Sequence, residues 1–345
     1  MGGDLYALDF DGVLCDSCGE SSISALKAAK IRWPALFEGV SSELDEWIID
    51  QMRIVSFLVF LQINVLFCRL KFRSISVNPF CYLVSMTSPG RALWLRPVVE
   101  TGYENLLLVR LLLEIQEPFV RKSSVAEGLT VEAILEKWSE LKPVIMKEWD
   151  EESSDLITVF GSVRDEWMDK DLSGWIDANR FYPGIADALR FASSAVYIVT
   201  TKQSRFADAL LRKLAGVTIP AERIYGLGTG PKVEVLKKLQ AMPEHQNLKL
   251  HFVEDRLTTL KNVIKETALD GWNLYLGNIL YLPLPSHFLA TAIDDLQAFF
   301  TKLSTKFINL QTGRWGYNTE KEREEAKSIS RIQLLDLSDF SSKLK

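Results

Sequence analysis

The sequence predicts an α/β protein with a Rossmann-like parallel sheet as its core and a helical domain inserted after the first strand. The chain opens on an apolar run, from Leu5 to Leu8, that ends at two aspartates. Helical periodicity dominates the region from Ser22 to Met168. From Phe181 onward, short apolar runs alternate with helical patterns, which is typical of a parallel sheet.

The opening strand leads into Asp9-Phe-Asp11-Gly12. Residues i and i+2 of a strand project to the same side, so both carboxylates can face one reacting group. Gly12 allows the backbone to turn sharply after them. The spacing predicts a phosphoryl-transfer site with Asp9 as nucleophile, although Asp-x-Asp-Gly also fits a calcium-binding loop.

Helices are expected through most of the first half of the chain, and Ser42 and Thr130 read as N-caps. The expected helices are Ser22 to Trp33, Ser42 to Met52, Glu104 to Glu117, Thr130 to Leu141 and Asp155 to Met168.

The second half predicts strands near 195–200, 223–226, 249–254 and 272–276. We therefore assign residues 1–18 and 180–345 to the sheet core and 19–179 to a helical cap. Parallel sheets of this kind bind ligands outside the carboxyl ends of their strands, which is where the site is expected.

Three later motifs fall at such positions. Thr200 ends an apolar strand, Lys232 follows Gly228-Thr-Gly-Pro231 at the start of a helix, and Glu254-Asp255 end another strand. Each has a structural alternative: Thr200 as the cap of a helix beginning near Ser204, Lys232 as a solvated lysine, and the acidic pair as turn residues.

A nucleophile strand, a strand-end threonine, a loop lysine and an acidic strand end, in this order, resemble the haloacid dehalogenase-like (HAD) hydrolase superfamily. The stretches Ser17 to Met52, Arg96 to Asn278 and Trp315 to Lys345 are similar to an uncharacterised plant and cyanobacterial branch of it. The resemblance implies a magnesium-dependent phosphatase. The second acid common in the superfamily, four residues after the first, is Thr259 here.

The residue types predict the division of roles. Asp9 attacks phosphorus to form an aspartyl-phosphate, and Asp11 serves as general acid and then general base. Thr200 and Lys232 hold the phosphoryl oxygens. Two carboxylates repel a phosphate dianion, so Mg²⁺ is expected, with Asp9, Asp11 and Asp255 as ligands and Glu254 as a further candidate.

The expected substrate is a small phosphorylated metabolite, such as a sugar phosphate or phosphoglycolate. The alternative is a non-catalytic binding or regulatory protein on the same scaffold. A net charge of −5 without a basic block argues against nucleic acid as a partner. No signal peptide or membrane span is recognised, so we expect a cytoplasmic protein, or a plastid one if a transit peptide precedes this sequence.

Cys15-Asp-Ser-Cys18 forms a C-x-x-C motif. It could be a redox pair or half of a zinc site, but no second cysteine pair and no histidine cluster completes it. The simpler interpretation is two small residues that line the turn after the nucleophile.

Two segments look foreign to the design. From Gln51 to Val99 there is no Asp or Glu, although the chain has 45, and twelve of the fifteen residues from Ile54 to Cys68 are apolar. Residues 53–95 and 279–314 interrupt the resemblance to the HAD branch. We interpret both as translated intron or misannotated exon, with a partner-binding insertion as the alternative.

Overall fold

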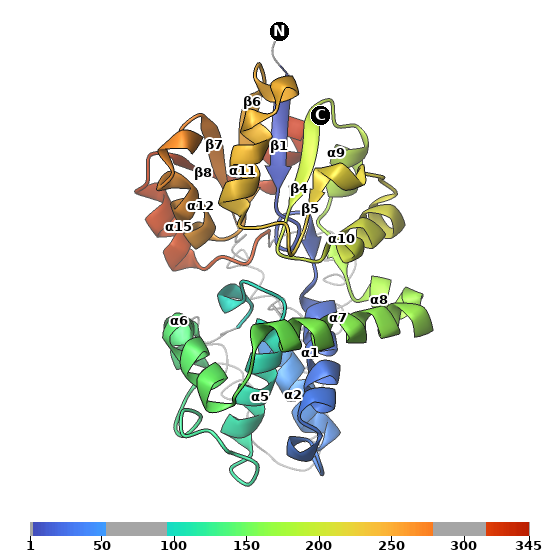
Figure 1. The fold of residues 1–345 in the computed structure, drawn as a ribbon, viewed down its shortest axis with the longest axis vertical. Helices are drawn as coiled ribbons and strands as arrows, with labels where there is room; N and C mark the ends of the chain where they lie inside the picture. Colours follow the sequence, from blue (N-terminus) through green and yellow to red (C-terminus); the bar gives the residue numbers. More distant parts are fainter. Residues whose placement is uncertain (1–2, 53–94, 279–314, 345) are drawn as a thin grey trace, which may run out of the picture. The chain divides into compact units, whose positions relative to one another are not determined.

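A computed structural model describes residues 3–52, 95–278 and 315–344. The chain divides into two compact units, residues 1–17 with 170–345, and residues 18–169. We describe each unit by itself (Figure 1). The sequence placed residues 170–179 with the helical part, whereas their contacts group them with the sheet.

The first unit contains a six-stranded sheet in the order β5-β4-β1-β6-β7-β8, and every neighbouring pair is parallel. This confirms the predicted α/β class with a parallel sheet, which is compatible with a Rossmann-like core. The four later strands predicted from the sequence are present, and β8 is an additional edge strand that was not predicted. The strands are β1 (Asp4–Leu8), β4 (Ala195–Val199), β5 (Ile224–Tyr225), β6 (Lys249–Glu254), β7 (Trp272–Gly277) and β8 (Ile332–Leu335).

The central strand β1 is buried on both faces, as its uninterrupted apolar run requires. Leu5 pairs with Ala195 of β4 on one side and with Leu250 of β6 on the other. Along the chain, the strands after β1 first add on the β4 side, and β6 then returns to the other side of β1. The order reverses at β1, which is where open parallel sheets bind ligands.

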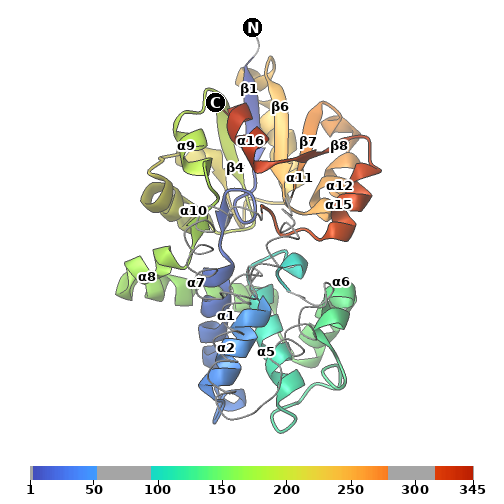
Figure 2. The ribbon, with the colours of Figure 1, turned by 180° about the vertical axis from the view of Figure 1, so that it is seen from behind.

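Helices cover both faces of this sheet. α11 crosses in front of the strands in Figure 1, and α16 does so in the reverse view of Figure 2. A capping box between Thr319 and Glu322 starts α15. The helices of this unit are α8 (Leu172–Asp177), α9 (Ile185–Arg190), α10 (Ser204–Leu210), a π-helical turn (Leu211–Ala215), α11 (Lys232–Ala241), α12 (Leu257–Ile264), α15 (Glu320–Lys327) and α16 (Leu337–Leu344).

The first unit also contains a two-stranded ribbon, whose first strand ends just before the chain leaves this unit at Ser17. β2 (Cys15–Asp16) pairs antiparallel with β3 (Arg180–Phe181). Neither strand was predicted. The ribbon holds residues 15–16, which follow Asp11 closely, against residues 180–181.

The second unit is all helical in its described residues, and its five α-helices correspond to the five predicted. They are α1 (Cys18–Arg32), α2 (Ser42–Met52), α5 (Glu104–Gln116), α6 (Val131–Glu148) and α7 (Ser153–Lys170). α5 is central, because every residue from Glu104 to Glu114 is buried. A bidentate ion pair between Arg164 and Glu20, at 2.7 and 2.8 Å, links α7 to α1.

Two helix ends differ from the prediction. Thr130 caps α6 as expected, but α2 is capped by Ser41 rather than Ser42, since the Ser41 hydroxyl accepts from the amide of Leu44. α6 also continues through Pro143 to Glu148. Proline frees the carbonyl four residues earlier, at Ser139, which lies on the exposed side of the helix where water can hydrate it.

The two segments interpreted as foreign, 53–95 and 279–314, lie outside the described residues except for Leu95. Among the helices that are described, none is both long and apolar enough to cross a membrane.

Candidate functional site

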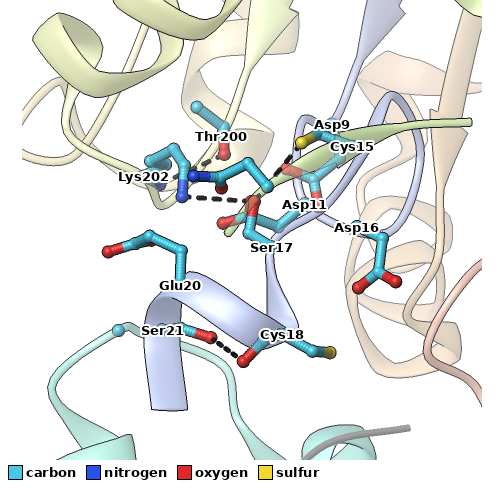
Figure 3. A network of polar contacts seen from close by, with 12 residues as sticks. Asp9, Asp11, Cys15, Asp16, Ser17, Cys18, Glu20, Ser21, Thr200 and Lys202 are labelled. Atoms are coloured by element: carbon cyan, nitrogen blue, oxygen red, sulfur yellow. Dashed lines mark hydrogen bonds and ion pairs between the residues drawn. The ribbon is translucent and has the colours of Figure 1, made fainter. Parts of the chain in front are cut away.

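The Asp-x-Asp loop leaves the carboxyl end of β1 in a tight turn. The Asp9 amide donates to the Val253 carbonyl of β6 at 3.0 Å, so strand pairing continues up to Asp9. Gly12 has a φ of +87° and donates its amide to the Cys15 carbonyl. This conformation suits glycine. Figure 3 shows the aspartates on either side of Phe10, Asp9 and Asp11, with Cys15 and Ser17 from the turn that follows them.

Asp9 is 5% exposed and pairs with Lys232, whose Nζ lies 2.9 Å from Oδ1. The same Nζ lies 2.7 Å from Oε2 of Glu254. Burial raises the pKa of Asp9 to about 7, against the opposing pull of the Lys232 ammonium. The two carboxylates raise the pKa of Lys232 despite its burial, so this lysine stays charged.

Lys232 begins α11 directly after Pro231, and its side chain is only 12% exposed. The interpretation of Lys232 as a solvated helix residue is therefore wrong. Gly228 and Gly230, both at positive φ, shape the loop that precedes Lys232.

Thr200 follows β4, and its amide donates to the Tyr225 carbonyl of β5. Its hydroxyl accepts from the amide of Lys202 at 3.1 Å. α10 begins after Gln203, and within the described part of the chain no side chain caps it, so the reading of Thr200 as its cap is also wrong.

Lys202 was not selected from the sequence. Its side chain is 1% exposed, and its Nζ lies 3.2 Å from Oδ1 of Asp11. Figure 3 shows Lys202 extending from the end of β4 toward the loop that carries Asp11. The only signal in the sequence was its place at a strand end, two residues after Thr200.

The acidic pair ends β6, beside β1. Glu254 is fully buried, and its Oε1 accepts from the amides of Asp255 and Arg256 while Oε2 contacts Lys232. Burial raises the pKa of Glu254, an effect that the Lys232 ammonium opposes. Asp255 is 2% exposed, and its Oδ2 accepts from the amide of Tyr317 at 3.0 Å.

The loop Trp315–Asn318 surrounds this acidic pair and was not predicted as part of the site. The Asn318 amide group donates to the carbonyls of Asp255 and Gly277 at 3.0 and 2.8 Å. Trp315 donates its indole N–H to the Val13 carbonyl. The Tyr317 hydroxyl accepts from the Ser17 amide at 2.9 Å. The loop therefore ties the end of β6 to the turn that follows Asp11.

Cys15 and Cys18 are both free and buried. Burial raises the pKa of the Cys15 thiol to about 12, and the Ser17 hydroxyl lies 3.5 Å from its sulfur. A thiol that stays protonated at neutral pH is a poor nucleophile and a poor metal ligand. Cys15 is therefore best read as a small buried residue lining the turn.

One oxygen each from Asp9, Glu254 and Asp255 lies within 4.8 Å of the others, which is close enough for one ion to contact all three. An all-oxygen carboxylate set suits a hard cation such as Mg²⁺. Asp9 and Asp255 fit this role best, because both Glu254 oxygens already accept hydrogen bonds. Asp11 was also predicted as a ligand. Its side chain is not part of this cluster and contacts Lys202 instead.

Comparisons with protein-family models, with curated proteins and with solved structures found no match for this chain.

Proposed function

We propose that this protein is a magnesium-dependent phosphatase that hydrolyses a small phosphate monoester through an aspartyl-phosphate on Asp9. The observation that carries the proposal is the pairing at the end of β1, where Asp9 and Asp11 each contact a buried lysine next to the Glu254–Asp255 pair. The proposal agrees with the resemblance to HAD hydrolases.

In the first step, an Asp9 carboxylate oxygen attacks phosphorus as the bond to the ester oxygen breaks, and Asp11 donates a proton to the leaving oxygen. In the second step, Asp11 accepts a proton from water as that water attacks phosphorus and releases Asp9. Lys232, held by Glu254, keeps the nucleophile oriented and favours its ionised form.

The charge balance supports a divalent cation. The four carboxyl groups of Asp9, Asp11, Glu254 and Asp255 and the two ammonium groups of Lys202 and Lys232 together carry a net charge of −2 when all six are ionised. A phosphate dianion would be repelled there. Bound Mg²⁺ would neutralise that charge and polarise the phosphoryl group, with Asp9 and Asp255 as its protein ligands.

Thr200 and Lys232 are proposed to hold the phosphoryl oxygens. The Thr200 hydroxyl accepts from the Lys202 amide, so its own proton is available to an oxygen of the substrate. Lys232 supplies charge, and positioning with electrostatic stabilisation carries most of the catalysis in phosphoryl transfer.

The helical unit is proposed as a substrate-selecting cap. Its residues lie between β2 and β3 in the chain, and β2 begins four residues after Asp11. The groups proposed to act at phosphorus are all in the sheet unit, so discrimination between metabolites would fall to residues outside it. A panel of phosphorylated metabolites would identify the substrate.

The test is Mg²⁺-dependent release of phosphate from p-nitrophenyl phosphate by the full chain. Asp9→Asn and Asp11→Asn should each abolish turnover and leave the circular dichroism spectrum unchanged, while Asp187→Asn on the exposed side of α9 serves as control. Beryllium fluoride should bind to the wild type only with Mg²⁺. Turnover surviving in Asp9→Asn would contradict the mechanism. A wild type that binds Mg²⁺ and beryllium fluoride without turnover would instead indicate a non-catalytic binding protein.

A further inference from the structure

We propose that Lys202 is a positioning residue that holds Asp11 in the orientation needed to protonate the leaving oxygen. This inference rests on the proposed phosphatase function. It gives Lys202 a role at Asp11 that parallels the role of Lys232 at Asp9.

The two aspartates are paired separately. Lys232 reaches Asp9 from the start of α11, at 2.9 Å, and Lys202 reaches Asp11 from the end of β4, at 3.2 Å. The two lysines thus come from different secondary-structure elements. Each carboxylate can therefore be fixed independently of the other, as a nucleophile and a general acid require.

The exposure of the pair shows which partner faces the reacting group. The Asp11 side chain is 20% exposed, whereas the Lys202 side chain is 1% exposed. Asp11 is thus reachable by a substrate, and Lys202 lies behind it. A lysine whose main task was to bind phosphate would instead present its ammonium to the open side.

The backbone of Lys202 is fixed on both sides. Its amide donates to the Thr200 hydroxyl at 3.1 Å, and its carbonyl accepts from the amide of Leu227 at 3.0 Å. A Cβ on Gly226 would lie 2.7 Å from that carbonyl oxygen, so the two loops are in close contact. The ammonium therefore projects from a rigid base and can define the Asp11 rotamer.

Burial of an ammonium group is costly unless a charge or hydrogen-bond acceptor compensates it. Lys202 accordingly favours an Asp11 carboxyl held close to it, which accepts from the ammonium when ionised in the second step and, through its carbonyl oxygen, when protonated in the first. Loss of the charge should release Asp11 to other rotamers, and the rate of proton transfer to the leaving oxygen should fall because that step depends on geometry.

The experiment compares p-nitrophenyl phosphate with phenyl phosphate, which has a similar shape but a poorer leaving group. Protonation by Asp11 matters more for phenyl phosphate. In Lys202→Met, kcat/KM for phenyl phosphate should fall about tenfold or more beyond the fall for p-nitrophenyl phosphate, since general acids contribute 10²–10⁴-fold. Lys202→Arg should restore much of the loss, and Lys237→Met, at a half-buried position of α11 where the lysine pairs with Glu234 and Glu266, should change neither value.

Equal losses for both esters, with weaker inhibition by inorganic phosphate, would show that Lys202 binds the phosphoryl group and would overturn the inference. Unchanged kcat/KM values for both esters would also overturn it. If Lys202→Met does not fold, Lys202→Gln replaces it. A wild type that hydrolyses neither ester would refute the proposed function itself, which is a different result.

Discussion

The backbone amide of Tyr317 donates a hydrogen bond to Oδ2 of Asp255 at 3.0 Å, although the two residues are 62 positions apart in the chain. Asn318, the next residue, donates from its side chain to the Asp255 carbonyl. Asp255 is thus fixed through both its carboxylate and its backbone by one loop. Partners of this kind orient metal ligands, and their loss typically weakens metal binding 10- to 100-fold.

From this arrangement we predict that Asp255→Ala raises the Mg²⁺ concentration required for activity most strongly, and that Asn318→Ala raises it by about tenfold. The same order should appear in the Mg²⁺-induced increase of the thermal midpoint, which needs no turnover. Thr259→Ala, four residues further on in α12, is the control. Similar responses from Asp255→Ala and Thr259→Ala would place the metal site elsewhere.

Gly12→Ala should disrupt the site more than any other glycine change at positive φ. A Cβ at Gly12 would lie 2.2 Å from Oδ2 of Asp255 and 2.9 Å from the ring of Tyr317. Gly39 is the matched control, because its φ of +78° is close to the +87° of Gly12 and nothing lies within 4 Å of its Cβ position.

Both substitutions pay for a left-handed conformation, on the order of 1 kcal/mol. Only Gly12→Ala must also displace Asp255. We expect urea unfolding to show a larger loss of stability for Gly12→Ala, with weakened Mg²⁺ binding in addition. Equal losses in the two variants would mean that the loop yields without disturbing Asp255.

The pKa of Asp9 predicts a pH-dependent stability in the absence of metal. Burial raises this pKa from 3.8 to about 7, so folding takes up a proton between these values. The stabilising contribution of the protonated group is complete below about pH 4 and is lost as pH rises through 7. An asparagine at this position does not ionise, so Asp9→Asn does not lose this stability as pH rises. The thermal midpoint of Asp9→Asn minus that of the wild type should therefore grow from pH 5 to pH 8.

Asp187→Asn should show a constant difference from the wild type over the same range. At pH 8, Mg²⁺ should stabilise the wild type more than Asp9→Asn, because the ion binds the ionised carboxylate and thereby favours the folded state. A difference that shrinks with rising pH would contradict the assignment of the proton to Asp9.

The parts of the site that could be predicted lie at strand ends, where residues close in sequence carry the signal. The structure brings Asp9 and Asp255 together as expected, because the carboxyl ends of the parallel strands β1 and β6 meet at one edge of the sheet, and Lys232 reaches Asp9 from the start of α11. Lys202 was missed because a lone lysine after a strand is usually solvated, and only the structure shows the loops that bury it.

Long-range contacts account for the rest. The role of Tyr317 depends on pairing with a residue 62 positions away, which no local pattern encodes. β8 is a four-residue edge strand, too short for a clear alternation. α6 passes Pro143 because its exposed side tolerates the unpaired carbonyl, so tertiary placement overrode the helix-breaking tendency of proline.

The final prediction concerns residues 53–94 and 279–314. The described residues on either side of each segment lie next to each other. The Leu95 amide donates to the Gln51 carbonyl at 3.1 Å, and a Cβ on Gly277 would lie 3.7 Å from Trp315. Short Gly-Ser linkers in place of each segment should therefore join the chain without moving α2, β7 or the Trp315 loop.

We expect the doubly shortened protein to fold, with a soluble yield and thermal midpoint at least equal to those of the full chain and with its Mg²⁺ response intact. The physical reason is that the described residues of each unit form a large buried apolar cluster of their own, whereas the first segment carries the apolar stretch from Ile54 to Cys68, which adds hydrophobic surface to the unfolded and partly folded chain. Single deletions separate the two contributions. If a shortened protein unfolds at a lower temperature, or loses phosphatase activity that the full chain has, then that segment belongs to the native structure and the interpretation of it as foreign is wrong.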